Sequence, residues 1–146
     1  VWPHDNALIA LGLSRYGFKA ETMKVFSGLF DATHFLDQSR LPELFCGFFR
    51  RKGVGPTLYP VACAPQAWSS ATPFALIEAA LGLHFDYAKN EIRFEDPRLP
   101  DFLSEMCLRK LRLGDSTISV RLQRVGDDVS LNVLDRSGDV RVLVVK

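Results

Sequence analysis

The sequence predicts an α+β fold in which helices come first and an antiparallel sheet follows. The spacing of apolar residues is helical up to about residue 83, and after it apolar and polar residues alternate as they do in strands. Charge follows the same division, because residues 84–146 hold 11 acidic and 11 basic side chains and residues 1–83 hold fewer of each. We therefore predict two domains, a helical one at 1–83 and a small antiparallel β domain at 84–146.

The composition narrows the class of protein. The chain has 146 residues, 47% of them hydrophobic, with Lys+Arg 18 against Asp+Glu 17. A chain of this length and composition can bury a core. The nearly balanced charge disfavours nucleic acid and anionic membrane surfaces as partners, since both select basic proteins.

Three cysteines at wide spacing, Cys46, Cys63 and Cys107, fit neither a disulfide framework nor a metal site. We expect reduced thiols, a cytoplasmic location and no metal or other cofactor. No apolar run approaches the roughly 20 residues of a membrane helix, so no membrane partner is expected.

Three helices are predicted in the first domain. The first, about 5–16, follows Pro3, has Asp5 or Asn6 as its N-cap and ends before Gly17. The second, about 19–36, has one polar face. The third, about 65–83, contains Pro73, which should kink it or delay its regular start.

The first and third of these helices are apolar nearly all round, whereas the second is amphipathic. A helix without a polar face is buried on every side. A chain of this size does not supply enough neighbours for that, and alternating burial indicates two concentric layers of helices, some of them outside this sequence.

Six strands are predicted in the second domain, with turns at Lys89-Asn90, Gly114-Asp115, Gly126-Asp127-Asp128 and Ser137-Gly138-Asp139. The segment 101–105 is predicted as a short helical turn. The predicted strands are 84–88, 91–95, 108–113, 117–125, 129–134 and 140–145.

The segment from Arg40 to Trp68 combines a carboxylate, Glu43, with Tyr59, Gln66 and Trp68 in a stretch rich in Pro and Gly. Sugar rings lie on aromatic faces, and their hydroxyls need amide and carboxylate partners. This mixture favours a saccharide pocket. The short basic run Arg50-Arg51-Lys52 is interpreted as a solvated loop or a contact to a neighbouring loop.

Four motifs, V-W-P-H-D-N-A-L-I-A, L-P-E-L-F-C-G-F, Y-P-V-A-C-A-P-Q-A-W-S and A-L-G-L, resemble the last third of bacterial glycogen debranching enzymes of the amylo-α-1,6-glucosidase type. The resemblance implies the last helices of an (α/α)6 toroid, the six-hairpin glycosidase fold, followed by a small antiparallel β domain. It also implies that the sequence begins inside a motif of a longer parent chain.

The resemblance implies hydrolysis of α-1,6-glucosidic branch linkages in glycogen-type glucans by two carboxylates. Inverting glycosidases hold these groups roughly 6.5–9.5 Å apart so that a water molecule fits. The L-P-E-L glutamate, here Glu43, would be the general base, and the general acid would lie upstream of Val1, so the fragment alone should not turn over. The residues expected to bind substrate are Trp2, His4, Asp5, Asn6, Tyr59, Gln66 and Trp68.

Simpler interpretations stay open for these residues. Asp5 could only cap a helix, Glu43 could be a solvated loop carboxylate, and core packing alone could explain Trp2 or Trp68. Two other functions remain as alternatives: a non-catalytic carbohydrate-binding or structural module, and a helical interaction domain without a sugar role. The expected partners are an α-glucan oligosaccharide, the rest of the parent chain and, through exposed apolar helices, a second copy.

Overall fold

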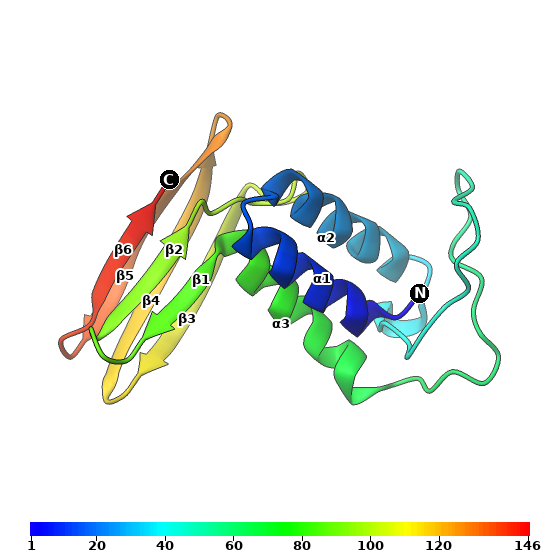
Figure 1. The fold of residues 1–146 in the computed structure, drawn as a ribbon, viewed down its shortest axis with the longest axis horizontal. Coiled ribbons are helices and arrows are strands. Elements are labelled where there is room, and N and C mark those ends of the chain that lie inside the picture. Colours follow the sequence, from blue (N-terminus) through cyan, green and yellow to red (C-terminus); the bar gives the residue numbers. More distant parts are fainter. The chain divides into compact units, whose positions relative to one another are not determined.

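The computed structural model describes residues 1–146 and has a mixed α+β fold with three α-helices and two three-stranded sheets (Figure 1). The predicted α+β class is confirmed. The chain divides into two compact units, Val1–Ala79 and Ala80–Lys146, here called the helical unit and the β unit. The division falls in the last turn of helix α3, Ala67–Leu81, a little before the predicted boundary at residue 83.

Helix α1, Pro3–Arg15, begins with proline at its first position. Proline suits this position because its missing N–H would have no partner within the helix. The N-cap is Trp2, which has extended backbone and no capping side chain, so the predicted cap at Asp5 or Asn6 is wrong. Asp5 instead lies in the first turn, where the helix dipole stabilises a carboxylate.

Helix α2, Lys19–Thr33, has the buried stripe that its amphipathic sequence predicts. Thr22, Phe26 and Leu29 lie three or four residues apart and are all buried. The helix ends three residues before the predicted end, and a short 3-10 helix, η1 at Asp37–Ser39, follows it. The stripe places the polar face of α2 toward solvent.

Helix α3 stays helical through Pro73 and begins two residues later than predicted. Two side chains from the α1 and α2 segments bind the end of this helix: the Ser14 hydroxyl and the Lys19 ammonium both donate to the carbonyl of Ala79, at 2.6 and 2.9 Å. These bonds tie together the three helices seen in Figure 1.

The apolar surfaces of α1 and α3 are only partly covered in this chain. Ala7 and Ala10 of α1 are buried, whereas Leu8 is 67% exposed. On α3, Trp68 and Phe74 are 67% and 75% exposed. Burial on every side, which the sequence predicts for both helices, is therefore not achieved by these 146 residues.

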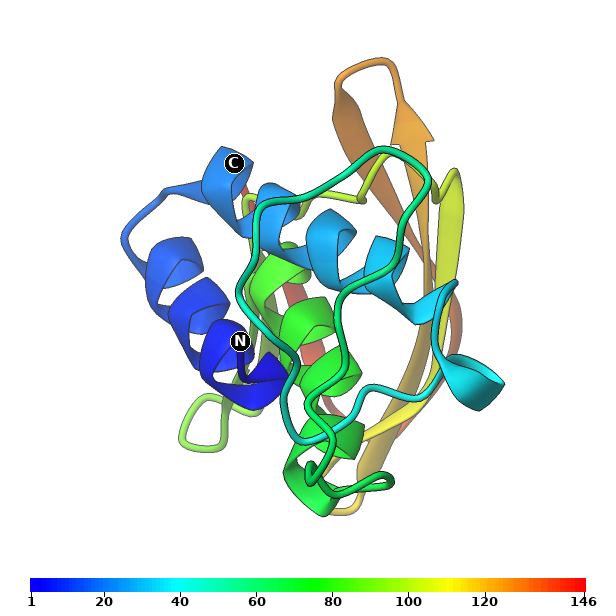
Figure 2. The ribbon, with the colours of Figure 1, turned by 90° about the vertical axis from the view of Figure 1, so that its right-hand side faces the viewer.

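The β unit contains two sheets that form two layers (Figures 1 and 2). One has the strand order β1-β2-β6 and the other the order β3-β4-β5. Strand β6 pairs with β2 in parallel, so the prediction of a purely antiparallel β domain is wrong at this one pair. The strands are β1 Leu83–Asp86, β2 Glu91–Glu95, β3 Glu105–Leu113, β4 Ser116–Val125, β5 Asp128–Ser137 and β6 Arg141–Val145.

The core of the β unit consists of the apolar residues that alternate along its strands. Phe94 and Ile92 on β2 are fully buried, as are Val120 and Leu122 on β4. This alternation is what a sheet with one buried face requires. The segment 101–105 contains a turn and the first residue of β3 rather than the predicted helical turn, and the Arg124 guanidinium donates to the carbonyls of Pro100 and Leu103.

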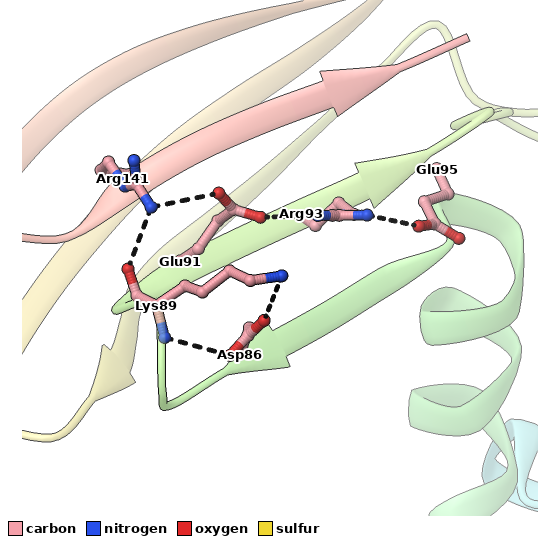
Figure 3. Close-up of polar contacts among 6 residues, drawn as sticks. All are labelled: Asp86, Lys89, Glu91, Arg93, Glu95 and Arg141. Carbon is pink, nitrogen blue, oxygen red and sulfur yellow. Dashed lines mark hydrogen bonds and ion pairs between the residues drawn. The ribbon is translucent and has the colours of Figure 1, made fainter.

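Charged side chains on the β1-β2-β6 sheet bind one another (Figure 3). Arg93 lies between Glu91 and Glu95, with N···O distances of 3.0 and 3.3 Å. Arg141 reaches the second oxygen of Glu91 at 3.8 Å. Each carboxylate in this row has a cationic partner, so the cluster is a structural network that stabilises the paired strands.

Candidate functional site

The predicted site residues lie on the first turn of α1, on the first turn of α3 and in the long loop from residue 40 to residue 66 (Figure 2). Backbone pairing folds the loop back on itself. Glu43 donates its N–H to the carbonyl of Cys63, and Cys46 donates to Thr57, at 2.9 and 2.8 Å. The loop is therefore similar to a hairpin, with its two arms joined by backbone hydrogen bonds.

Glu43 is fixed by this pairing. The backbone N–H of Cys63 donates to Glu43 Oε2 at 3.0 Å, which leaves Oε1 without a protein partner. The side chain is half-buried. An oriented carboxylate with one available oxygen has the geometry that a general base needs.

The neighbours of Glu43 connect it to both other segments of the site. The carbonyl of Pro42 accepts a buried hydrogen bond of 2.7 Å from the Ser69 hydroxyl at the start of α3. The N–H of Phe45 donates to the carbonyl of Val1, at 3.0 Å. The segment around Glu43 thus runs between the residues that precede α1 and the first turn of α3.

Trp2, His4 and Trp68 form a cluster of three rings where these segments meet. The His4 ring lies edge-on to both tryptophans, with centroid distances of 5.4 Å to Trp2 and 5.1 Å to Trp68. The His4 side chain is only 12% exposed, and its Nδ1 atom is buried without a hydrogen-bond partner. Both tryptophans keep exposed surface, so a ligand has access to each of them.

Asp5 and Asn6 lie beside this cluster. Asp5 Oδ1 is 3.7 Å from His4 Nε2, and its side chain is largely exposed. The amide of Asn6 donates to the carbonyl of Trp2 at 2.8 Å. Asn6 therefore stabilises the turn that contains Trp2, and Asp5 is the side chain of the two that is more accessible to a ligand.

Gln66 and Tyr59 are less clearly part of the site. Gln66 Oε1 accepts from the N–H of Ser69 at 3.3 Å, so this side chain caps the N-terminus of α3. Tyr59 is 45% exposed and lies on the returning arm of the loop, next to Leu58, which pairs with Phe45, and its carbonyl accepts from Ala62. No ring contact joins Tyr59 to the cluster of Trp2, His4 and Trp68.

A pocket of about 300 Å³ lies between the loop and α2, and sequence analysis did not find it. Of the predicted site residues only Asn6 lines it. The basic run Arg50-Arg51-Lys52 was the feature of the sequence that could have indicated this pocket. Arg50 forms an ion pair of 2.6 Å with Asp31 of α2, and Arg51 lines the pocket.

Shifted pKa values occur in the β unit. The backbone N–H of Lys89 donates to Asp86 and holds the pKa of that carboxyl below its ordinary value. A hydrogen bond from the Lys146 ammonium lowers the pKa of Asp128 in the same way, and the bonds to Glu91 and Glu95 raise the pKa of Arg93. These shifts come from hydrogen bonds to backbone N–H groups and to oppositely charged side chains.

The structure contains no metal-binding cluster, no disulfide and no membrane-spanning helix. No group of three His, Cys, Asp or Glu side chains is arranged to hold a metal ion. The three cysteines are unpaired. None of the helices has both the length and the hydropathy that crossing a bilayer requires.

No protein-family model matches the chain, and no curated protein matches its sequence significantly. The resemblance to glycogen debranching enzymes therefore stays a prediction that rests on the four motifs.

Proposed function

We propose that the chain is the C-terminal part of a cytoplasmic glycoside hydrolase that cleaves α-1,6-glucosidic branch linkages of glycogen-type glucans. In this proposal α1, α2 and α3 are the last helices of an (α/α)6 toroid, and the β unit is the domain that follows it. Glu43 is the general base, and its partner acid belongs to the rest of the parent chain.

One observation carries the proposal: three of the four motif segments, far apart in sequence, are hydrogen-bonded to one another. Pro42 accepts a bond from Ser69, the neighbour of Trp68 in sequence, and Phe45 donates to Val1, the neighbour of Trp2. The segment of Glu43 is therefore bonded to residues next to both tryptophans. A carboxylate near exposed aromatic rings matches the chemistry of a sugar site, where ring faces bind C–H surfaces and a carboxylate serves the hydroxyls or the attacking water.

The remaining residues take roles that fit their surroundings. Trp2 and Trp68 supply stacking faces, and His4 lies edge-on to both rings while its buried Nδ1 lacks a protein partner. Asp5 is exposed enough to accept from a sugar hydroxyl. Asn6, Gln66 and Tyr59 complete the predicted wall, with Asn6 and Gln66 also engaged in local backbone bonds.

Glu43→Gln in the complete parent enzyme tests the catalytic role. Glutamine keeps an oxygen that can accept from Cys63, so folding should be unchanged, but it cannot accept a proton from water. Glucose release from a singly branched α-1,6 oligosaccharide should fall by about 10²- to 10⁴-fold. Glu78→Gln, an exposed carboxylate on α3, is the matched control and should keep full activity. Equal activity of Glu43→Gln and wild type would refute the role.

A second function, a carbohydrate-binding module without catalysis, is favoured by the bond from Cys63 to Glu43, which gives this carboxylate a structural purpose. Calorimetric titration of the chain with isomalto-oligosaccharides separates the two. Binding that Trp68→Ala abolishes, together with full activity of Glu43→Gln in the parent, would support the module. Loss of activity in Glu43→Gln would support the hydrolase.

A further inference from the structure

The pocket between α2 and the loop at 45–57 belongs to the helical unit and is not explained by the proposed hydrolase site. Its volume of about 300 Å³ is at the lower end of the range of small-molecule sites. Four phenylalanine rings contribute to its surface, together with aliphatic residues of α2. The main apolar lining residues are Val25, Leu29, Phe35, Phe45, Phe48 and Phe49.

The loop wall of this pocket is held in place by specific contacts. Arg50 binds Asp31 of α2 at 2.6 Å, and Cys46 pairs with Thr57 across the loop at 2.8 Å. Gly55 lies so close to Phe35 that a Cβ atom at this position would be 2.5 Å from the Phe35 Cβ. Only glycine lets the loop approach Phe35 this closely, so this wall of the pocket requires glycine at position 55.

The charged side chains that line the pocket are all cationic. Lys24, Arg50 and Arg51 belong to the lining, and no aspartate or glutamate does. The charge of Arg50 is offset by Asp31, but Lys24 reaches Glu21 only at 3.9 Å, and Arg51 takes part in no ion pair. An apolar pocket with a cationic rim complements a ligand that has an apolar body and one negative charge.

We propose that this pocket binds a small aromatic carboxylate. The aromatic body packs against the phenylalanine rings, for which offset and edge-to-face contacts are favourable. The carboxylate lies toward Arg51 and Lys24, where hydrogen bonds between charged groups are stronger than neutral ones. A neutral glucan fits this charge pattern poorly, and the pocket shares only Asn6 with the predicted sugar-binding residues, so the proposal concerns a second site beside that of the hydrolase.

Calorimetric titration of the chain with 2-naphthoate, and separately with 2-naphthylmethanol, tests the ligand class. The alcohol has the same ring system without the charge, so it should bind at least roughly tenfold more weakly, because it loses the charge-assisted bonds. Equal affinity of both compounds would overturn the role of the cationic rim. No binding of either compound would overturn the pocket as a site for this class.

Two helix glycines offer a matched pair of variants for locating the site. Gly28 on α2 lines the pocket, Gly12 on α1 does not, and a Cβ atom at either position meets no atom within 4 Å. Leucine at Gly28 should fill the pocket and weaken naphthoate binding by roughly tenfold or more, and Gly12→Leu should leave it unchanged. Naphthoate affinity that survives in Gly28→Leu would place the binding elsewhere and refute the proposal.

A charge variant tests the site without altering a helix. Arg51→Gln should weaken naphthoate binding severalfold and leave the binding of 2-naphthylmethanol unchanged. Lys52→Gln, its neighbour outside the lining, should change neither. Equal effects of the two substitutions would indicate general attraction of anions and overturn the specific site. Isomalto-oligosaccharide binding should be the same in all these variants, so the hydrolase proposal stands or falls independently.

Discussion

The helical unit and the β unit differ in how far they bury their large apolar side chains. The largest fully buried apolar side chains, Phe94, Leu81 and Ile92, all belong to the β unit. In the helical unit Leu8, Phe49 and Phe74 are exposed. The β unit thus has the better-covered core, whereas the helical unit presents apolar surfaces that can still bind a partner.

Two phenylalanines sharpen this comparison because the same substitution should be costly at one of them and nearly neutral at the other. Phe94 in the β unit is fully buried, whereas Phe49 on the loop of the helical unit is 99% exposed. Phe94→Ala should lower the free energy of unfolding by about 3–5 kcal/mol, because it leaves a cavity. Phe49→Ala should stay within about 0.5 kcal/mol of wild type. Urea denaturation followed by circular dichroism measures both, and equal losses would contradict the comparison.

Two glycines with positive φ should also differ between the units. Gly82, in the β unit, has φ +55, and a Cβ atom there would lie 2.1 Å from the carbonyl oxygen of Glu95. Gly17, after α1, has φ +83 but open space around it. Gly82→Ala should cost at least about 2 kcal/mol because strain and clash add, and Gly17→Ala about 1 kcal/mol from strain alone. Thermal melting that ranks them in reverse would refute the close approach.

Self-association should depend on the helical unit. We expect the 146-residue chain to associate through the exposed apolar surface of α1, since contiguous apolar patches favour such contacts. Replacing Leu8 and Ile9 together by lysine should raise the dissociation constant by roughly tenfold or more. Tyr87→Ser, an exposed aromatic residue of the β unit, should leave it unchanged. Light scattering across concentrations measures this, and a monomeric wild type at every concentration would contradict it.

The smallest effect concerns the pH dependence of the β unit. The pKa of Asp86 is lowered in the folded state, so this group stabilises the fold above its ordinary pKa of 3.8, and the stabilisation is lost as pH falls through the folded pKa. The urea midpoint of Asp86→Asn should therefore lie below that of wild type at pH 6 and approach it as the pH falls below 3.8 and through the folded pKa. A constant difference for Asp86→Asn at all pH values would exclude the linkage.

The secondary structure was largely predictable because its signals are local. The period of apolar residues placed α2 and α3 within a few residues, and the alternation along residues 117–125 placed β4. The cap of α1 was not predictable in the same way. Asp5 and Asn6 are both good capping residues, but Pro3 is able to occupy the first helical position and moved the start of the helix upstream.

The sequence alone determined which residues are apolar on which face, and therefore the α+β class and the strands of the β unit. Only the tertiary structure decided that β6 joins β2 in parallel, because any two strands offer the same backbone donors and acceptors. It also decided that Val1, Pro42 and Ser69 meet around Glu43, and that Arg51 lines a pocket with Phe35. Such contacts join segments far apart in the chain, and no local period of residues encodes the partner that a distant segment will have.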